Sequence, residues 1–372
     1  MSDENKKGIR FLCISCYSTI DAEPKLIGSK QSCPHCRQPV NVPKVSLFCD
    51  EVLCGYKINK FLGAGGMGEV YQALHIEDDK EVALKVIRPQ VVNEEEIENF
   101  KKEIRMNLRV SHSNFVRGYE AGTDEHGRHF LAMEFIRGRS LEDHIIKRGR
   151  FDEDHALSII LTVAKALCSA FNNWQIIHRD IKPSNILISK ANVIKIMDLG
   201  ISTPVSENND DLHVIGTPYY MSPEQIRTPA SIDQRADIYS LGATLYELLT
   251  GMEPFNGKNS DEIFNKVLNE TPMNPKTLRP KLSDATCNLI KKFMHKDKNR
   301  RPNNWEEAIS DIEAAVNRYQ DENSYELETK NPKLIYTMKK DMKNYAPLML
   351  AGLGLFTLFI AFAYWLVTNF IP

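Results

Sequence analysis

Residues 177–187 read IHRDIKPSNIL, the most specific string in the chain. Its Asp180 carboxylate can accept the proton of a hydroxyl group. Lys182, two residues later, can neutralise charge on a phosphate. Asn185 offers a neutral oxygen to a hard cation. One short segment therefore carries a proton acceptor, a cation and a neutral oxygen donor.

A glycine-rich stretch at residues 62–70 reads LGAGGMGEV and contains the pattern G-x-G-x-x-G-x-V. A dinucleotide-binding turn would run into a helix, whereas residues 70–74 and 81–87 are typical of two strands. Strand alternation places Ala83 and Lys85 on the face opposite Val82, Leu84 and Val86. A lysine in an apolar strand needs an anionic partner, unless it reaches water from an edge strand. A glycine hairpin over phosphates within reach of Lys85 supplies that partner.

Together these motifs resemble the eukaryotic-type (Hanks-type) serine/threonine protein kinases of bacteria, over residues 56–318. The resemblance implies an α+β protein-kinase fold with a small β-rich N-lobe and a large α-helical C-lobe. It also implies a signalling enzyme that uses ATP and Mg²⁺ (or Mn²⁺) to phosphorylate Ser and Thr hydroxyls of proteins, including its own. A pseudokinase scaffold that recruits partners is the alternative, and the intact Lys85, Asp180 and Asp198 argue against it.

The resemblance assigns catalytic and ligand-binding roles. Asp180 and Lys182 are the expected catalytic residues, and Asn185 and Asp198 are expected to bind magnesium. Asp198 begins an Asp-Leu-Gly triplet in which Leu199 replaces the usual phenylalanine. The residues expected around ATP are Leu62, Gly63, Ala64, Gly65, Gly66, Met67, Gly68, Val70, Ala83, Lys85, Glu103 and the hinge residues Glu134 and Ile136.

Glu103 is the expected partner of Lys85. It lies in a stretch with helical spacing of apolar residues, at Ile97, Phe100, Ile104 and Leu108. Glu103 borders that apolar stripe, where a side chain can point into a cleft. A solvated glutamate is the alternative interpretation.

Further positions carry structural or regulatory expectations by analogy with the family. Thr217 is expected to support the catalytic loop, Asp237 to anchor it, and Glu224 to pair with Arg301, or else with Arg300. Arg179 beside the catalytic aspartate suggests activation by a phosphate in the activation segment. The candidate acceptors are Ser202, Thr203 and Ser206.

Two C-x2-C pairs near the N-terminus, Cys13 with Cys16 and Cys33 with Cys36, have the spacing of a four-cysteine zinc site. Residues 11–43 form a unit too small to fold on a hydrophobic core alone, so metal binding would supply folding free energy. The unit resembles a zinc ribbon with a closed, structural Zn²⁺ site. Disulfides and an iron site are the alternatives.

An apolar run at residues 348–367 is long enough to span a bilayer as a helix, which we place at residues 346–369. A buried core helix is the alternative. Flanking cations precede the run, at Lys333, Lys339, Lys340 and Lys343. The positive-inside rule then predicts a single-pass, tail-anchored protein of the cell (inner or plasma) membrane with its kinase domain in the cytoplasm. The bilayer, protein substrates and other copies of the chain are the expected partners.

The composition limits the remaining possibilities. The 372 residues contain 47 Lys and Arg against 49 Asp and Glu, a net charge of −2 that does not favour nucleic-acid binding by the whole chain. Nucleic-acid binding by the N-terminal unit stays a separate alternative. The expected organisation is a polar N-terminus (1–10), the cysteine unit (11–43), a linker (44–55), the kinase domain (56–318), a charged juxtamembrane segment (319–345) and the membrane helix (346–369).

Overall fold

The structure, a computed structural model, describes residues 8–64, 68–87, 94–199, 218–227 and 232–330. Residues up to Val316 form one compact unit, and residues from Asn317 belong to a second, of which the part up to Lys330 is described. The predicted membrane helix at 346–369 lies outside the described residues, as do the candidate phosphorylation sites and Thr217.

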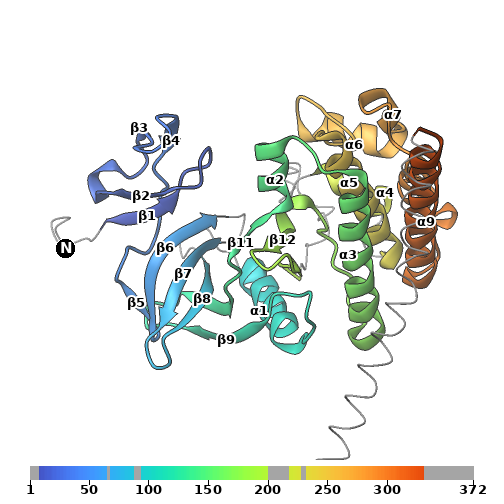
Figure 1. Ribbon diagram of the computed structural model, residues 1–372. Coiled ribbons are helices and arrows are strands. Elements are labelled where there is room, and N and C mark those ends of the chain that lie inside the picture. Colours follow the sequence, from blue (N-terminus) through green and yellow to red (C-terminus); the bar gives the residue numbers. More distant parts are fainter. Residues whose placement is uncertain (1–7, 65–67, 88–93, 200–217, 228–231, 331–372) are drawn as a thin grey trace, which may run out of the picture. The chain divides into compact units, whose positions relative to one another are not determined.

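Two small antiparallel sheets begin the described chain (Figure 1). Strands β1 (Ile9–Leu12) and β2 (Thr19–Ala22) form one, and β3 (Lys30–Ser32) and β4 (Pro39–Asn41) form the other. A short 3₁₀ turn, η2 (Pro24–Leu26), lies between them. Each hairpin turn carries one C-x2-C pair. We call residues 9–43 the cysteine ribbon.

The N-lobe contains one six-stranded antiparallel sheet with the order β5-β6-β7-β8-β10-β9. The strands are β5 (Val52–Leu53), β6 (Tyr56–Ala64), β7 (Gly68–His75), β8 (Lys80–Ile87), β9 (Gly118–Thr123) and β10 (His129–Glu134). Alternation along β8 is as predicted. Val82, Leu84 and Val86 belong to one apolar cluster, and Ala83 belongs to another on the opposite face.

Helix α1 (Glu94–Arg109) is the predicted helix that follows β8. Phe100 is buried and Ile104 packs against the same cluster, whereas Leu108 is 46% exposed. The apolar stripe therefore ends one turn earlier than the sequence spacing suggests.

The C-lobe is mainly helical and starts with a three-stranded sheet of β11 (Gly138–Ser140), β12 (Ile186–Ser189) and β13 (Ile194–Ile196). Its helices are α2 (Leu141–Arg148), α3 (Glu153–Trp174), α4 (Pro223–Arg227), α5 (Gln234–Thr250), α6 (Ser260–Asn269), α7 (Pro275–Leu278), α8 (Asp284–Phe293) and α9 (Trp305–Lys330). Short 3₁₀ turns are η3 (Pro183–Asn185), η4 (Pro218–Tyr220) and η6 (Lys298–Arg300).

Helix α5 forms the centre of this lobe, because its residues are buried on every side from Ala236 to Thr250. Gly242 permits close packing there, since a Cβ at this position would lie 2.7 Å from the side chain of Phe293. Among the described residues, α3 is the one helix long and apolar enough to cross a membrane. Its apolar face is buried inside the lobe, at Leu157, Ile160, Val163 and Leu167, which identifies α3 as a core helix.

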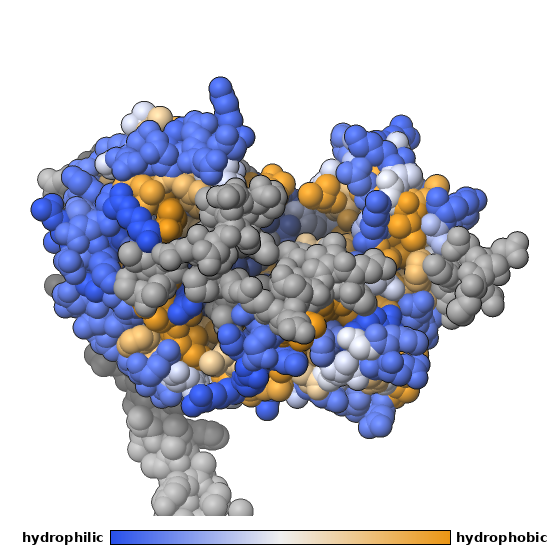
Figure 2. Space-filling model, turned by 180° about the vertical axis from the view of Figure 1, so that it is seen from behind, coloured by the Kyte–Doolittle hydropathy of each residue, from blue (hydrophilic) through white to orange (hydrophobic). Residues whose placement is uncertain are grey.

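Hydrophobic residues that reach the surface are dispersed. Figure 2 shows a face on which orange hydrophobic residues lie in separate patches among blue hydrophilic ones. The large apolar side chains that are most exposed come from different elements, among them Ile14, Val52, Ile76, Ile146 and Met273. Single exposed apolar residues of this kind are ordinary on protein surfaces.

Candidate active site

Three charged side chains meet between the N-lobe sheet, helix α1 and the segment after β13. The Lys85 Nζ atom lies 2.6 Å from Glu103 Oε1 and 3.2 Å from Asp198 Oδ1. Burial opposes the charge of Lys85, but the charges of Asp198 and Glu103 outweigh it and raise its pKa. Likewise burial opposes ionisation of Asp198, but Lys85 lowers the pKa of its carboxyl. The cluster therefore favours the charged forms of Lys85 and Asp198 at one buried point, whereas burial raises the pKa of Glu103 above its ordinary value.

The segment that contains Asp180 is a compact loop built on side-chain hydrogen bonds. Asn185 Nδ2 donates to the main-chain oxygen and to Oδ2 of Asp180, each at 2.8 Å. Lys182 Nζ lies 2.9 Å from the same Asp180 Oδ2. The three residues that the sequence grouped around phosphate and cation chemistry thus lie in direct contact.

Asp237 of the buried helix α5 anchors this loop through hydrogen bonds to its main chain. Its two oxygens accept the main-chain N–H groups of His178 and Arg179, each at 2.7 Å. Arg179 has a positive φ of 66°, and Asp198 one of 54°. Such backbone costs on the order of 1–3 kcal/mol per residue and persists where surrounding contacts impose it. His178 Nε2 contacts Met197 O at 3.1 Å, and so ties the loop to the segment that ends in Asp198.

A second buried ion pair lies behind the segment at residues 222–225. Arg301 donates to Glu224 through both terminal nitrogens, at 2.6 and 2.8 Å, with its side chain fully buried. Arg300, the alternative partner, is exposed. Gln225 Nε2 donates to the main-chain oxygen of Arg179 at 2.9 Å, which links this region to the catalytic loop.

An apolar cluster adjoins the charged residues. Ala83, Val116 and Met133 are buried there, and the partly buried hydrophobic residues packed against them are Leu62, Val70, Phe135, Ile136 and Met197. These residues come from both lobes and from the segment that joins them. Because all of them are apolar, the cluster offers the surface that a purine ring requires. Glu134 ends β10, and its side chain is 2.7 Å from Lys195 Nζ.

The glycine-rich segment is described on both sides of its tip. Gly63 and Ala64 end β6, Gly68 begins β7, and the predicted residues Gly65, Gly66 and Met67 lie outside the described part. A Cβ on Gly68 would lie 2.4 Å from the main-chain oxygen of Val86, so β7 can approach β8 closely only with glycine here.

Sequence reasoning missed several residues of the site. Val116 and Met197 complete the apolar cluster, and His178 links the two catalytic segments. Only His178 had a signal in the sequence, as the first residue of the His-Arg-Asp triplet. Val116 and Met197 are ordinary apolar residues whose position depends on the fold.

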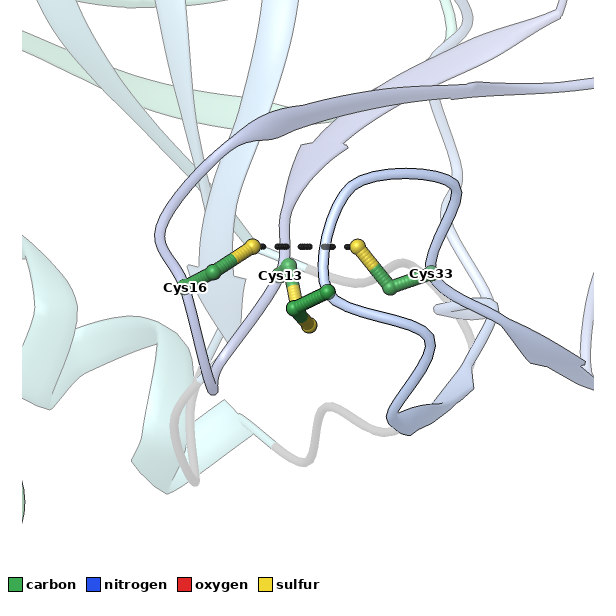
Figure 3. A group of neighbouring side chains, drawn as sticks. Cys13, Cys16 and Cys33 are labelled. Atoms are coloured by element: carbon green, nitrogen blue, oxygen red, sulfur yellow. Dashed lines mark hydrogen bonds between the residues drawn. The ribbon is translucent and has the colours of Figure 1, made fainter.

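The four cysteines of the ribbon converge on one point, with all four sulfur atoms within 4.8 Å of one another. The Sγ atoms of Cys13 and Cys36 are 3.7 Å apart. Those of Cys16 and Cys33, which a dashed line joins in Figure 3, are also 3.7 Å apart. A disulfide requires about 2.05 Å, so the disulfide alternative is wrong. Thiolates about 2.3 Å from a tetrahedral zinc ion would be about 3.8 Å apart. The sulfur positions therefore fit Zn²⁺.

Hydrogen bonds favour the thiolate, which is the form that binds metal, at one of these cysteines. Hydrogen bonds from Ser18 lower the pKa of Cys16 to about 6. A thiolate binds metal, whereas a thiol must first lose its proton. The donor set, four sulfur atoms gathered at one point, agrees with a zinc ribbon.

The lobes, the Lys85–Glu103–Asp198 cluster and the supported catalytic loop define a protein of the kinase fold. Comparison with known families gives the same class, because the family described as "protein kinase domain" matches residues 56–312 of this chain. The chain belongs to the protein kinase domain family.

Relatives in bacteria share this part of the chain. Serine/threonine-protein kinase PrkC of Bacillus subtilis is 36% identical over 263 residues, which cover 70% of this chain and 40% of PrkC. Probable serine/threonine-protein kinase CPE1738 of Clostridium perfringens is 36% identical over 264 residues, 69% of this chain and 38% of the relative. The chain thus matches less than half the length of these relatives. A crystal structure of the Mycobacterium tuberculosis PknI kinase domain covers 73% of this chain, with a TM-score of 0.57 and 23% identity, and supports the fold.

Proposed function

We propose that this chain is an ATP-dependent protein serine/threonine kinase that transfers the γ-phosphate of ATP to Ser and Thr hydroxyls of proteins. The observation that carries the proposal is the position of Lys85, which contacts Glu103 and Asp198 at once. An ammonium held between two carboxylates, on a strand paired with the one that follows the glycine-rich segment, is suited to orient phosphate groups. The names of the relatives, which are serine/threonine-protein kinases, support the same activity.

Each residue of the site has a role in this reaction. Asp180 would accept the proton of the attacking hydroxyl, and Lys182, which contacts it, would stabilise charge on the moving phosphate. The carboxylate of Asp198 and the amide oxygen of Asn185 are hard donors that fit Mg²⁺. Magnesium, when bound, supplies charge neutralisation at the phosphates. The apolar cluster around Ala83 and Ile136 would bind adenine, with main-chain groups of Glu134 and Ile136 as hydrogen-bond partners.

Transfer of label from γ-³²P-ATP to a generic basic protein tests the kinase activity. We expect Lys85→Met and Asp180→Asn to reduce labelling by about a thousandfold, because each removes a charge that acts on the transferring group. Lys101→Met, at an exposed position of α1, is the matched control and should keep wild-type activity. Equal labelling by wild type and Lys85→Met would contradict the kinase and favour the scaffold alternative.

The same chain should also modify itself. Autophosphorylation at Ser202, Thr203 or Ser206 would supply the phosphate that Arg179, beside Asp180, is expected to bind. Self-association in a membrane would raise the local concentration of acceptor and enzyme. Mass spectrometry of wild type and Asp180→Asn separates self-modification from action by another kinase, because phosphate that persists in the variant must come from elsewhere.

The ribbon is proposed to hold a structural zinc ion through Cys13, Cys16, Cys33 and Cys36. Metal analysis of the purified chain should give about one zinc per chain and none after Cys13→Ser with Cys16→Ser. Cys54→Ser changes an exposed cysteine outside the cluster and should keep the zinc. Iron in the purified chain would favour the alternative metal.

We further propose a single membrane helix at residues 346–369 with the kinase domain in the cytoplasm. The run at residues 348–367, whose only polar members are Thr357 and the belt-type Tyr364, and the preceding lysines support it. Membrane fractionation of the full chain and of a chain that lacks 346–369 tests it. Equal recovery of both in the soluble fraction would overturn the proposal.

A further inference from the structure

Tyr17 is part of the first metal-binding turn of the cysteine ribbon, directly after Cys16. Its N–H donates to the Cys13 main-chain oxygen at 2.8 Å, and its φ is 61°. Arg37 occupies the same place in the second turn, with its N–H 2.9 Å from the Cys33 oxygen and φ 63°. The turn that aims the cysteine sulfurs inward therefore also fixes the direction of the Tyr17 side chain.

The Tyr17 side chain reaches the C-lobe. Its hydroxyl donates to Asp143 Oδ1 at 2.9 Å, and the Arg139 guanidinium lies 4.0 Å from the centre of its ring. This contact joins two segments 126 residues apart in the sequence.

Asp143 connects this contact to the catalytic loop. Its Oδ2 accepts the Ser140 N–H at 3.2 Å in the capping box that begins α2. Arg139 belongs to β11 and pairs with Ile188 of β12, the strand that follows Asn185. Tyr17 thus contacts the strand and helix that support the loop of Asp180.

The ribbon also contacts the strands that carry the glycine loop. Phe61 packs against the apolar core of the ribbon, and Phe61 and Leu62 of β6 line a cavity of about 220 Å³ together with Phe11 and Val40. The linker is fixed to the next strand, because the Ser46 N–H donates to Glu69 Oε2 of β7 at 3.0 Å. Glu69 is 3% exposed and also accepts from the Tyr71 hydroxyl at 2.6 Å.

We propose that the metal-bearing cysteine ribbon braces the two lobes, with Tyr17 as a positioning residue for phosphoryl transfer. The ribbon holds β6 on one side of the hinge and α2 on the other, and the linker that follows it holds β7. In the arrangement of the lobes that these contacts hold, Lys85 contacts both Glu103 and Asp198. ATP must bind between the lobes, and the apparent dissociation constant of a ligand rises as the competent arrangement becomes less populated. The inference rests on the kinase function proposed above.

The variant Tyr17→Phe tests the brace because it keeps the ring on Arg139 and removes only the hydrogen bond to Asp143. We expect the KM for ATP to rise about fivefold, the fold-change that corresponds to the typical net contribution of one hydrogen bond, with kcat unchanged. A merely destabilised enzyme would lose kcat through a smaller folded fraction and keep its KM. Tyr119→Phe is the control, since that ring contacts Lys80 within the N-lobe and should leave KM unchanged.

A double-mutant cycle assigns the effect to the contact itself. Asp143→Ala removes the acceptor together with part of the α2 cap, and in this background Tyr17→Phe should have no further effect on KM. An equal fivefold rise in both backgrounds would overturn the proposal, because the hydroxyl would then act elsewhere.

Hydrogen exchange of the full chain gives a readout that does not depend on activity. Tyr17→Phe, and separately Cys13→Ser with Cys16→Ser, should increase amide exchange at residues 138–148, with little change in α5. Unchanged exchange at 138–148 in both variants would refute the brace even if the kinase is active. An inactive wild type that shows the expected exchange would instead contradict the proposed function and leave the brace supported.

Discussion

The kinase domain and the cysteine ribbon hold their loops together by different means. In the kinase domain, a helix buried on every side, α5, supplies Asp237 to the catalytic loop and packs against α8 and α3. The ribbon has a small core built from short strands, and its two turns meet at four sulfur atoms. The difference teaches that a large apolar core can support strained, charged loops, whereas a short unit depends on coordination chemistry.

Removal of metal should produce the largest difference between the two regions, because it should unfold the ribbon and leave the kinase domain folded. Structural zinc contributes about 10–16 kcal/mol in small zinc domains, more than a unit of this size can replace. We expect a strong chelator to abolish protection from hydrogen exchange at residues 9–42 while that of α5 persists. If chelation instead unfolds both regions at the same chelator concentration, the kinase core depends on the ribbon for its stability.

Loss of the buried Arg301–Glu224 pair should have the next largest effect, confined to the kinase domain. Arg301→Met leaves Glu224 buried without its cation, which costs about 3–5 kcal/mol. Thermal unfolding should show a clearly lower Tm, whereas Arg300→Met at an exposed position should change stability by less than about 0.5 kcal/mol. Equal Tm values for the two variants would contradict the contact.

The close approach of β7 and β8 predicts a smaller effect, confined to the N-lobe. Gly68→Ala places a Cβ 2.4 Å from the main-chain oxygen of Val86, and the shift this forces should destabilise the N-lobe by about 1–3 kcal/mol and weaken ATP binding. Gly63→Ala is matched, because a Cβ there meets nothing within 4 Å. Isothermal titration with ATP and thermal unfolding of both variants measure the difference. Equal losses in both variants would contradict the steric explanation.

A dependence on pH of opposite sign should also distinguish the two regions. Burial raises the pKa of Glu247 to about 7, above its ordinary value of 4.5. Between these values the folded chain binds more protons than the unfolded chain, so this group's contribution to stability falls as pH rises from about 4.5 to 7. Glu247→Gln should remove that slope from the pH profile of kinase-domain stability, measured by urea unfolding.

The ribbon should respond in the opposite direction over the same range. Protons compete with metal for thiolates, so zinc affinity falls as pH falls. Zinc release followed with a chromogenic chelator should therefore increase below neutral pH. A ribbon that keeps zinc equally well at pH 5 and pH 7 would contradict four-thiolate coordination.

The sequence predicts the fold class and most contacts of the catalytic residues because these depend on motifs with fixed spacing. The predicted pairs Lys85 with Glu103 and Glu224 with Arg301 lie in contact, and the two-lobed fold is confirmed. The roles of these residues in catalysis stay predictions that the variants above test. Arg301 could not be separated from Arg300 by sequence, because the choice depends on which side chain the fold buries.

Contacts between distant segments were beyond sequence reasoning. Tyr17 and Asp143, or Ser46 and Glu69, carry no spacing rule, and each residue type is common on surfaces. The helix after Trp305 also continues to Lys330, past the predicted domain limit at residue 318, because the polar composition there is compatible with a helix as well as with a linker.

The clasp between Glu224 and Arg301 has a consequence for biosynthesis. The two residues are 77 positions apart, so at about 5–20 residues per second the ribosome adds Arg301 about 4–15 s after Glu224. During that interval Glu224 lacks Arg301, the cation with which it is paired in the folded interior. Docking of the segment around Glu224 must therefore await the last helices of the domain, and a nascent kinase should stay inert until its translation has passed that arginine.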